Sequence, residues 1–240
     1  VSPSPPERRV PPPSIRLRRR VTHFHHLDLL DANRRHQAQL VALALQKAPR
    51  TVGDRQGLVW IGNWGDGERT EELERFLFEP ARAADLPLDI YGVRYPKAAQ
   101  ATLARYGARY HGWAPNAAAP GLFAGALATV HVPRRYYATI LPGIPTIRVF
   151  EALACGIPLV SAPWRDSEGL FRPGIDFLFA KDGAEMTRHL TMLAHDADQR
   201  NALATAGRET ILARHTCAHR VDELLAILAQ LDATPRKEAA

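Results

Sequence analysis

Residues 142–161 read PGIPTIRVFEALACGIPLVS, and this stretch decides the fold. It predicts a loop, a short helix that contains Glu151, a glycine stop and a buried strand. Pro145 suits the first helical turn, where its missing N–H is no loss, and Gly156 suits the position just past the helix end. A helix start that faces the end of a parallel sheet presents unpaired N–H groups and the positive end of the helix dipole. The stretch therefore predicts a site for an anion such as a phosphate.

Arg148 is the unusual residue of this helix, because a cation in the first turn opposes the dipole. Helical spacing predicts a packing face and a polar face. These faces comprise Ile147, Phe150 and Ala154, and Arg148, Glu151 and Cys155, respectively. Two explanations of Arg148 are open at this point: it pairs with Glu151 one turn on, or it joins the helix amides in holding an anionic ligand.

The composition is that of an ordinary globular protein, with 46% hydrophobic and 23% charged residues among 240. No apolar run has the length of a membrane span, and no stretch has the layout of a secretory signal. Cys155 and Cys217 provide neither a disulfide framework nor a repeated metal-ligand spacing. These observations predict a cytoplasmic protein with no membrane span.

Residues 1–56 differ from the rest of the chain. Much of the net charge of +6 comes from arginines that stand among prolines in residues 1–22, a composition typical of a solvated tail. No aromatic residues alternate with these arginines, so nucleic-acid binding is not the favoured interpretation. The three histidines within 23–26 lack the cysteine or carboxylate pattern of a metal site, and no metal site is predicted. Residues 33–47 form a candidate amphipathic helix, and a linker follows it.

From residue 57 to 231 the chain alternates between strand-like and helix-like segments. Strands are expected at 58–62, 88–93, 109–113, 128–133, 158–162 and 177–180. Helices are expected at 69–84, 96–106 and 118–126, within the motif 142–161 after its opening loop, and at 183–195, 197–214 and 216–231. This order predicts an α/β fold: a Rossmann-like, largely parallel sheet with helices on both faces and a helical carboxyl-terminal end. Residues 232–240 are expected to form a tail.

Ligands of such a sheet bind outside the carboxyl ends of its strands, where four loops carry suitable chemistry. The loops are the glycine-rich Gly62–Arg69, Gly92–Arg94, His111–Trp113, and Arg134–Arg135 with the helix start that follows. Plainer interpretations stay open beside this one. The glycines are ordinary turn residues, Trp64 and Trp113 are either packing residues or stacking platforms, and both arginines could be surface charges. Asp66 and Glu68 oppose a phosphate in the first loop.

The segment FEALACGIPLV, residues 150–160, resembles the glutamate-alanine-x-alanine-x-glycine-x-proline-valine signature of group 1 GT-B glycosyltransferases. The resemblance is closest to the branch typified by the spore-maturation protein CgeB. It extends over residues 57–229, through 58–67, 111–113, 128–135 and 168–171 in the same order and spacing. It implies that the chain is the carboxyl-terminal, donor-binding half of a GT-B fold.

The resemblance also implies a nucleotide-diphosphate sugar as donor substrate, an acceptor of unknown identity and no tightly bound cofactor or required metal. Glu151 would accept hydrogen bonds from the ribose hydroxyls. Candidates for holding the diphosphate are Gly62, Asn63, Gly65, Arg69, Thr146 and Arg148. His111, Gly112 and Trp113 would border the base, and Arg94, Arg134, Arg135 and Gly143 are candidates for sugar or phosphate contacts.

Two features separate this chain from active, retaining relatives. Those relatives usually carry a second glutamate eight positions before Glu151, where this chain has Gly143. A GT-B enzyme also works in a cleft between two Rossmann-like domains, and residues 1–56 are too short to form the acceptor half. The expected activity is glycosyl transfer that needs a missing amino-terminal half, and the alternative is a non-catalytic nucleotide-sugar-binding or assembly module. A nicotinamide oxidoreductase is disfavoured, because the first loop has glycines at 62, 65 and 67 instead of the dinucleotide order.

Overall fold

A computed structural model gives the architecture of the chain, and it describes residues 55–65, 67–140 and 146–233. The basic tail up to residue 54, the candidate helix at 33–47, Asp66 and Gly143 lie outside the described residues.

Six strands form one parallel sheet in the order β3-β2-β1-β4-β5-β6. The strands are β1 (Leu58–Ile61), β2 (Leu88–Tyr91), β3 (Arg109–Tyr110), β4 (Ala128–His131), β5 (Leu159–Ser161) and β6 (Leu178–Phe179). This doubly wound order reverses direction between β1 and β4, the point at which such sheets bind ligands. The predicted Rossmann-like sheet is confirmed, with strands shorter than expected because the residues after each strand turn into loops.

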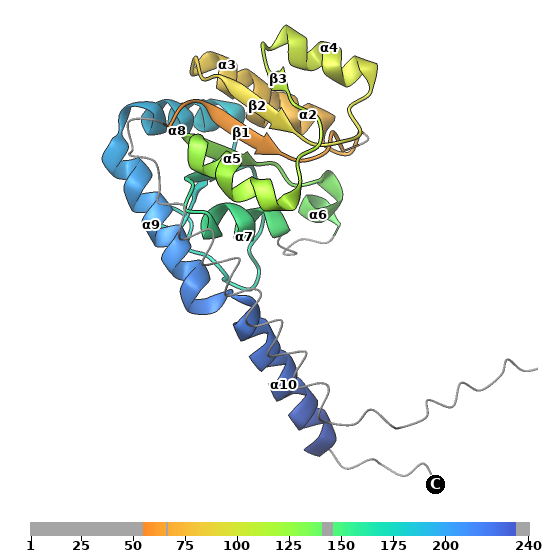
Figure 1. Ribbon diagram of the computed structural model, residues 1–240, viewed down its shortest axis with the longest axis vertical. Coiled ribbons are helices and arrows are strands. Elements are labelled where there is room, and N and C mark those ends of the chain that lie inside the picture. The colour runs from red at the N-terminus through yellow and green to blue at the C-terminus, as the bar shows by residue number, and fades with distance from the viewer. Residues whose placement is uncertain (1–54, 66, 141–145, 234–240) are drawn as a thin grey trace, which may run out of the picture.

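Helices cover both faces of the sheet, as Figure 1 shows. On one face lie α2 (Thr70–Leu73), η2 (Glu74–Phe78), α3 (Glu79–Ala83), α4 (Lys97–Arg105) and α8 (Gly183–His195), packed with Leu58 and Trp60 of β1. The other face carries α5 (Ala119–Gly125) and α7 (Ile147–Ala154), packed with Val59 of β1. The alternation of side chains along β1 therefore feeds two hydrophobic cores. A long helix, α9 (Ala197–Arg214), packs along α7.

The expected helix at 69–84 is one continuous helical run whose middle, η2, has π geometry. The wider π turn allows three consecutive side chains, Phe76, Leu77 and Phe78, to be buried together. Two short elements were not predicted: η3 (Asn116–Ala118), and α6 (Arg135–Thr139), which follows β4.

The last helix, α10 (Cys217–Ala233), extends away from the sheet (Figure 1). Several of its apolar side chains are exposed, among them Leu224, Leu225, Ile227 and Leu228. Within the described part of the chain, none of the helices combines the length and the apolar character needed to cross a membrane.

Candidate functional site

The helix of the deciding stretch is α7, and it begins and ends as its sequence predicts. Thr146 is the N-cap in extended conformation, and Gly156 follows the helix end at a φ of 64°. The packing face differs from the prediction. Val149, Ala152 and Leu153 are the buried residues, whereas Ile147 is 70% exposed. Ile147 lies in the first turn of α7 and is exposed, so its inclusion in the packing face was wrong.

Arg148 and Glu151 contact each other across one turn of α7. Arg148 Nη1 lies 2.6 Å from Glu151 Oε2, and both side chains are largely covered. Burial lowers the pKa of Arg148, and the neighbouring carboxylate of Glu151 partly restores it. The simpler explanation of Arg148 is therefore present in the structure. It does not exclude a ligand, because an anion at the helix start would meet the same guanidinium.

Arg69 brings a second guanidinium to this region from the other side of the switch point. It follows β1, donates to the carbonyl oxygen of Asn63 and to Val132 O at 3.3 Å, and covers the Trp60 ring with its guanidinium 5.1 Å from the ring centroid. Within the described residues, its Nε is buried without a hydrogen-bond partner. Burial lowers the pKa of Arg69 to about 10, and repulsion from Arg134 and Arg148 adds to the shift. This repulsion shows that three guanidinium groups share one region.

Arg134 and Arg135 connect the end of β4 to the first loop. Arg134 Nη1 donates to Glu68 Oε2 at 3.0 Å, and Arg135 pairs with Glu72 at 2.8 Å. The backbone N–H of Arg135 also donates to Glu68 O at 3.1 Å. Arg135 is thus a surface charge held by α2, whereas Arg134 lies near enough to Arg69 to repel it. Glu68 balances part of the positive charge here.

The first loop is fixed by packing around Gly62. The N–H of Gly62 donates to Tyr91 O, and its carbonyl accepts from Trp60 Nε1 and from the Tyr95 hydroxyl at 3.2 and 2.8 Å. These bonds engage both backbone polar groups of Gly62 within the chain. Gly65 has a φ of 95°, and a Cβ there would come within 2.7 Å of Arg69 Cγ, so the glycine lets the arginine lie across the loop. Trp64 is 7% exposed and stacks on Phe78, which makes it a packing residue.

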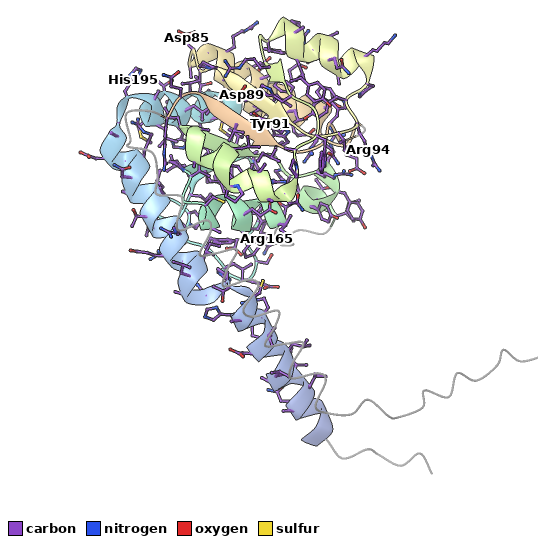
Figure 2. The ribbon with its side chains drawn as sticks, in the orientation of Figure 1. Asp85, Asp89, Tyr91, Arg94, Arg165 and His195 are labelled. Atoms are coloured by element: carbon purple, nitrogen blue, oxygen red, sulfur yellow. The ribbon has the colours of Figure 1, made fainter. Side chains whose placement is uncertain are left out.

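The second loop lies against the first. Val93 N donates to Asn63 Oδ1 at 3.2 Å, and a Cβ on Gly92 would come within 2.1 Å of the Gly62 carbonyl oxygen. Arg94 has a φ of 60° and is exposed. Figure 2 shows Arg94 at the end of the sheet where α6 lies, at the opposite end from Asp85 and His195.

The third loop carries the residues expected near a base. His111 stacks on Tyr91, with ring centroids 4.6 Å apart, and its Nε2 lies 2.6 Å from Asp89 Oδ1. Arg109 pairs with the same carboxylate through two hydrogen bonds of 2.7 and 2.6 Å. Burial would raise the pKa of Asp89, but the hydrogen bonds from Arg109 and His111 outweigh burial and lower it.

Trp113 lies beyond Gly112, which has a φ of 73°. The Trp113 side chain is 71% exposed, so it is not a packing residue of the core. Of the two tryptophans considered for stacking, the structure therefore leaves only Trp113 available.

His131 is the residue that sequence reasoning missed. It ends β4 with only 2% of its surface exposed, beside the switch point. Its Nδ1 lies 2.9 Å from Ser161 Oγ and its Nε2 lies 2.9 Å from Thr146 Oγ1. The pKa of His131 falls to about 3, because the ring is buried and the charges of Arg69 and Arg148 lie nearby. A histidine within a short strand whose residues are all buried was the available signal.

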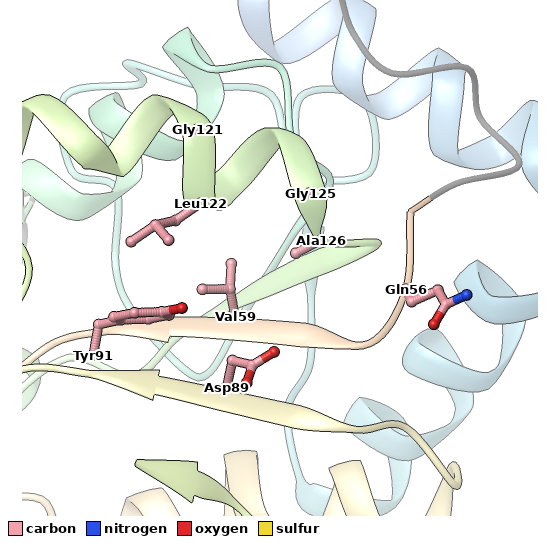
Figure 3. Close-up of a pocket in the computed structure, with 8 residues that line it drawn as sticks. All are labelled: Gln56, Val59, Asp89, Tyr91, Gly121, Leu122, Gly125 and Ala126. Carbon is pink, nitrogen blue, oxygen red and sulfur yellow. The ribbon is translucent and has the colours of Figure 1, made fainter. Parts of the chain in front are cut away.

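A pocket of about 190 Å³ lies between β1, β2 and α5, away from the site arginines (Figure 3). Val59, Asp89, Tyr91 and Leu122 are among the residues that line it, and none of the site arginines does. Its carboxylate, Asp89, is already engaged by Arg109 and His111, so we assign this pocket no role. Among the described residues, no group of three or more histidines, cysteines, aspartates or glutamates is arranged to hold a metal ion.

The sequence profile of the family described as "Glycosyl transferase-like" matches residues 69–226, more than half of the chain. The chain belongs to this glycosyl transferase-like family. The match covers Arg69, Arg134 and α7, and so includes the region of the three guanidinium groups. No curated protein matches the sequence.

Solved glycosyltransferase structures share the fold at low sequence identity. The β-glucosyltransferase of phage T4 in complex with UDP-glucose superposes with a TM-score of 0.59 and 16% identity, over 75% of this chain and 49% of that one. Sucrose-phosphate synthase from Thermosynechococcus elongatus gives 0.60 and 16%, over 80% and 49%. TarM from S. aureus gives 0.56 and 12%, over 71% and 35%. The chain thus spans about half or less of the length of these proteins and matches half-domains of the GT-B fold.

Proposed function

We propose that this chain binds a nucleotide-diphosphate sugar and forms the donor half of a glycosyltransferase of the CgeB-like branch. The diphosphate would lie between Arg69, Arg134 and the start of α7, and Glu151 would accept from the ribose. One observation carries this proposal: three guanidinium groups gather at the switch point of a parallel sheet, and the buried Arg69 is repelled by the other two.

Charge balance supports an anionic ligand. Glu68 pairs with Arg134 and Glu151 with Arg148, whereas the hydrogen bonds of Arg69 within the described residues go to carbonyl oxygens. A buried cation without a carboxylate partner is costly, and a diphosphate would offset that cost through charge-assisted hydrogen bonds. Guanidinium groups suit phosphate because they donate two parallel hydrogen bonds. We propose on this basis that they supply the positive charge and that donor binding needs no metal.

Further parts of the proposal concern the setting of the chain. The acceptor is unknown, and transfer would require an amino-terminal Rossmann-like half that meets residues 57–231. Two free cysteines, Cys155 and Cys217, suit a cytoplasmic location. A non-catalytic nucleotide-sugar-binding or assembly module is the second candidate, favoured by Gly143 at the position where retaining relatives carry glutamate. Transfer measured with the complete reading frame separates the two candidates.

Titration with UDP, GDP, ADP and dTDP, followed by calorimetry and thermal unfolding, tests donor binding. At least one of them should bind and raise the unfolding temperature, with or without EDTA. The change Arg69→Met keeps the length of the side chain and removes its charge, so it should weaken binding about 10- to 100-fold through loss of a charged hydrogen-bond donor. Glu151→Ala should abolish the thermal shift.

Arg105→Met is the matched control, because Arg105 is an exposed arginine of α4 that pairs with Glu74. It should leave binding unchanged. The proposal fails if none of the four diphosphates binds, or if Arg69→Met and Arg105→Met bind alike.

A further inference from the structure

The hydrogen bonds around His131 determine where its proton lies. Ser161 Oγ donates its hydrogen to Ala162 O at 2.8 Å. A hydroxyl has a single hydrogen, so Ser161 Oγ can only accept from His131 Nδ1, and Nδ1 must carry a hydrogen. Burial and the nearby guanidinium groups keep the ring neutral, as its pKa of about 3 indicates. In the neutral ring the other nitrogen, Nε2, is an acceptor.

Thr146 must therefore donate its hydroxyl hydrogen to His131 Nε2, at 2.9 Å. A threonine at the N-cap of a helix ordinarily turns its oxygen toward the backbone N–H groups of the first turn. Thr146 makes no such capping bond. Its hydroxyl is directed instead toward the ring of His131 in β4, whose other nitrogen contacts Ser161 of β5. The amides at the start of α7 are thus left without the side-chain acceptor that their own cap would supply.

We propose that His131 is a positioning residue, which keeps the Thr146 hydroxyl away from the first turn of α7 and so holds this helix start open for a diphosphate. The inference rests on the proposed function, since the diphosphate is the ligand that the open amides would meet. His131 itself does not touch the ligand. It acts through Thr146 on one side and is fixed by Ser161 on the other.

The premise can be observed by 15N NMR of the His131 side chain. The expected spectrum shows a protonated Nδ1 and an unprotonated Nε2 between pH 5 and pH 8. A protonated Nε2 in the unliganded wild-type chain would overturn the proposal.

Binding then tests the role. Ser161→Ala removes the acceptor that selects the tautomer, so the Thr146 hydroxyl becomes free to cap the first turn of α7. This change should weaken the nucleoside diphosphate that the wild type binds by about 5- to 10-fold, the effect of one net hydrogen bond, and leave the affinity for the matching nucleoside unchanged. In a Thr146→Val background, which has no hydroxyl to turn toward the helix, Ser161→Ala should cause no further loss, whereas in a Thr146→Ser background it should weaken the diphosphate again.

Thr129→Val is the matched control, because Thr129 is another buried threonine of β4 whose hydroxyl donates to Val59 O at 2.7 Å. It should lower stability without changing the ratio of the two affinities. Equal weakening of both ligands in Ser161→Ala, no weakening, or the same weakening of the diphosphate by Ser161→Ala with and without the Thr146 hydroxyl would overturn the role of His131 while donor binding stands. A wild-type chain that binds none of UDP, GDP, ADP and dTDP overturns the proposed function and, with it, the role of His131.

Discussion

The carboxyl-end edge of the sheet has two regions, and they are built in opposite ways. The phosphate region comprises Arg69, His131, Arg134, Thr146, Arg148 and Glu151 around the ends of β1 and β4. The base region comprises the loop His111–Trp113 after β3, together with Asp89 of β2 and Arg109 of β3, which contact each other and, through Asp89, His111. In the first, the partly buried Arg69 is repelled by Arg134 and Arg148. In the second, Asp89 already satisfies both Arg109 and His111.

The difference indicates where binding energy would come from. A region with surplus, desolvated positive charge gains from an anion, because its electrostatic interactions are weakly screened. A region whose charged groups are already paired and exposed gains little more from a polar ligand. We therefore expect the diphosphate to supply most of the affinity and the base to supply less. Three changes test this comparison, beginning with the largest effect.

Gly92 joins the two regions, and Gly92→Ala should have the largest effect. The N–H of Gly92 donates to Gly112 O, and an added Cβ would come within 2.1 Å of Gly62 O, so the strands would have to separate. We expect a loss of about 3 kcal/mol in the free energy of unfolding, seen as a fall of about 6–12 °C in thermal unfolding. Gly125→Ala is the control, because a Cβ on Gly125 meets nothing within 4 Å. Similar unfolding temperatures for the two variants would contradict the close contact.

The outline of the phosphate region could be predicted from sequence, because it depends on local rules. A proline near the start, a glycine at the end and an apolar strand after it locate α7 and β5, and a parallel sheet brings the loops after β1 and β4 together. Arg69 and Arg148 were expected at this site for that reason. The exposure of Ile147 was not predictable, because helical spacing alone does not show which turns of a helix other elements cover.

The role of His131 could not be predicted from sequence, because it depends on contacts between distant segments. Ser161 is 30 residues away and Thr146 is 15 residues away, and only the folded sheet places a hydroxyl at each ring nitrogen. The distinction between Arg134 and Arg135 is similar. Adjacent arginines look alike in sequence, and the start of α6, which was not predicted, turns Arg135 toward Glu72.

The pH dependence of stability tests how deeply the phosphate region is buried. The pKa of His131 is about 3 in the folded chain and near 6.5 when unfolded, so the unfolded state binds the extra proton between these values. This contribution to stability is fully present above pH 6.5 and declines as the pH falls. Urea titrations at pH 6.5 and pH 5 should show a loss of about 1.5 kcal/mol from this group.

His131→Gln is the comparison for this measurement, because glutamine does not titrate. The loss assigned to His131 is the difference between the two chains across the same pH interval. Carboxylates with lowered pKa values, such as Asp89 and Glu72, stay ionised in this interval and do not contribute to the difference. If both chains lose the same stability between pH 6.5 and pH 5, the ring is not buried and neutral as described.

Trp113→Ala should have the smallest effect, and it tests the base region. The indole is 71% exposed, so its removal should change the free energy of unfolding by less than about 0.5 kcal/mol. If a base stacks on the indole, the variant should bind the ligand about 5-fold more weakly, a loss of about 1 kcal/mol in binding free energy. This value is at the lower end of the range for base–aromatic stacking, because only one ring contacts the base. Trp113→Phe keeps an aromatic face and should retain most of the affinity.

Calorimetry with the diphosphate that binds best and with inorganic pyrophosphate separates the contributions of the two regions. Pyrophosphate has no base, so it should bind both Trp113 variants as it binds the wild type. A loss for Trp113→Ala larger than that for Arg69→Met would reverse the comparison and make the base region the main source of affinity.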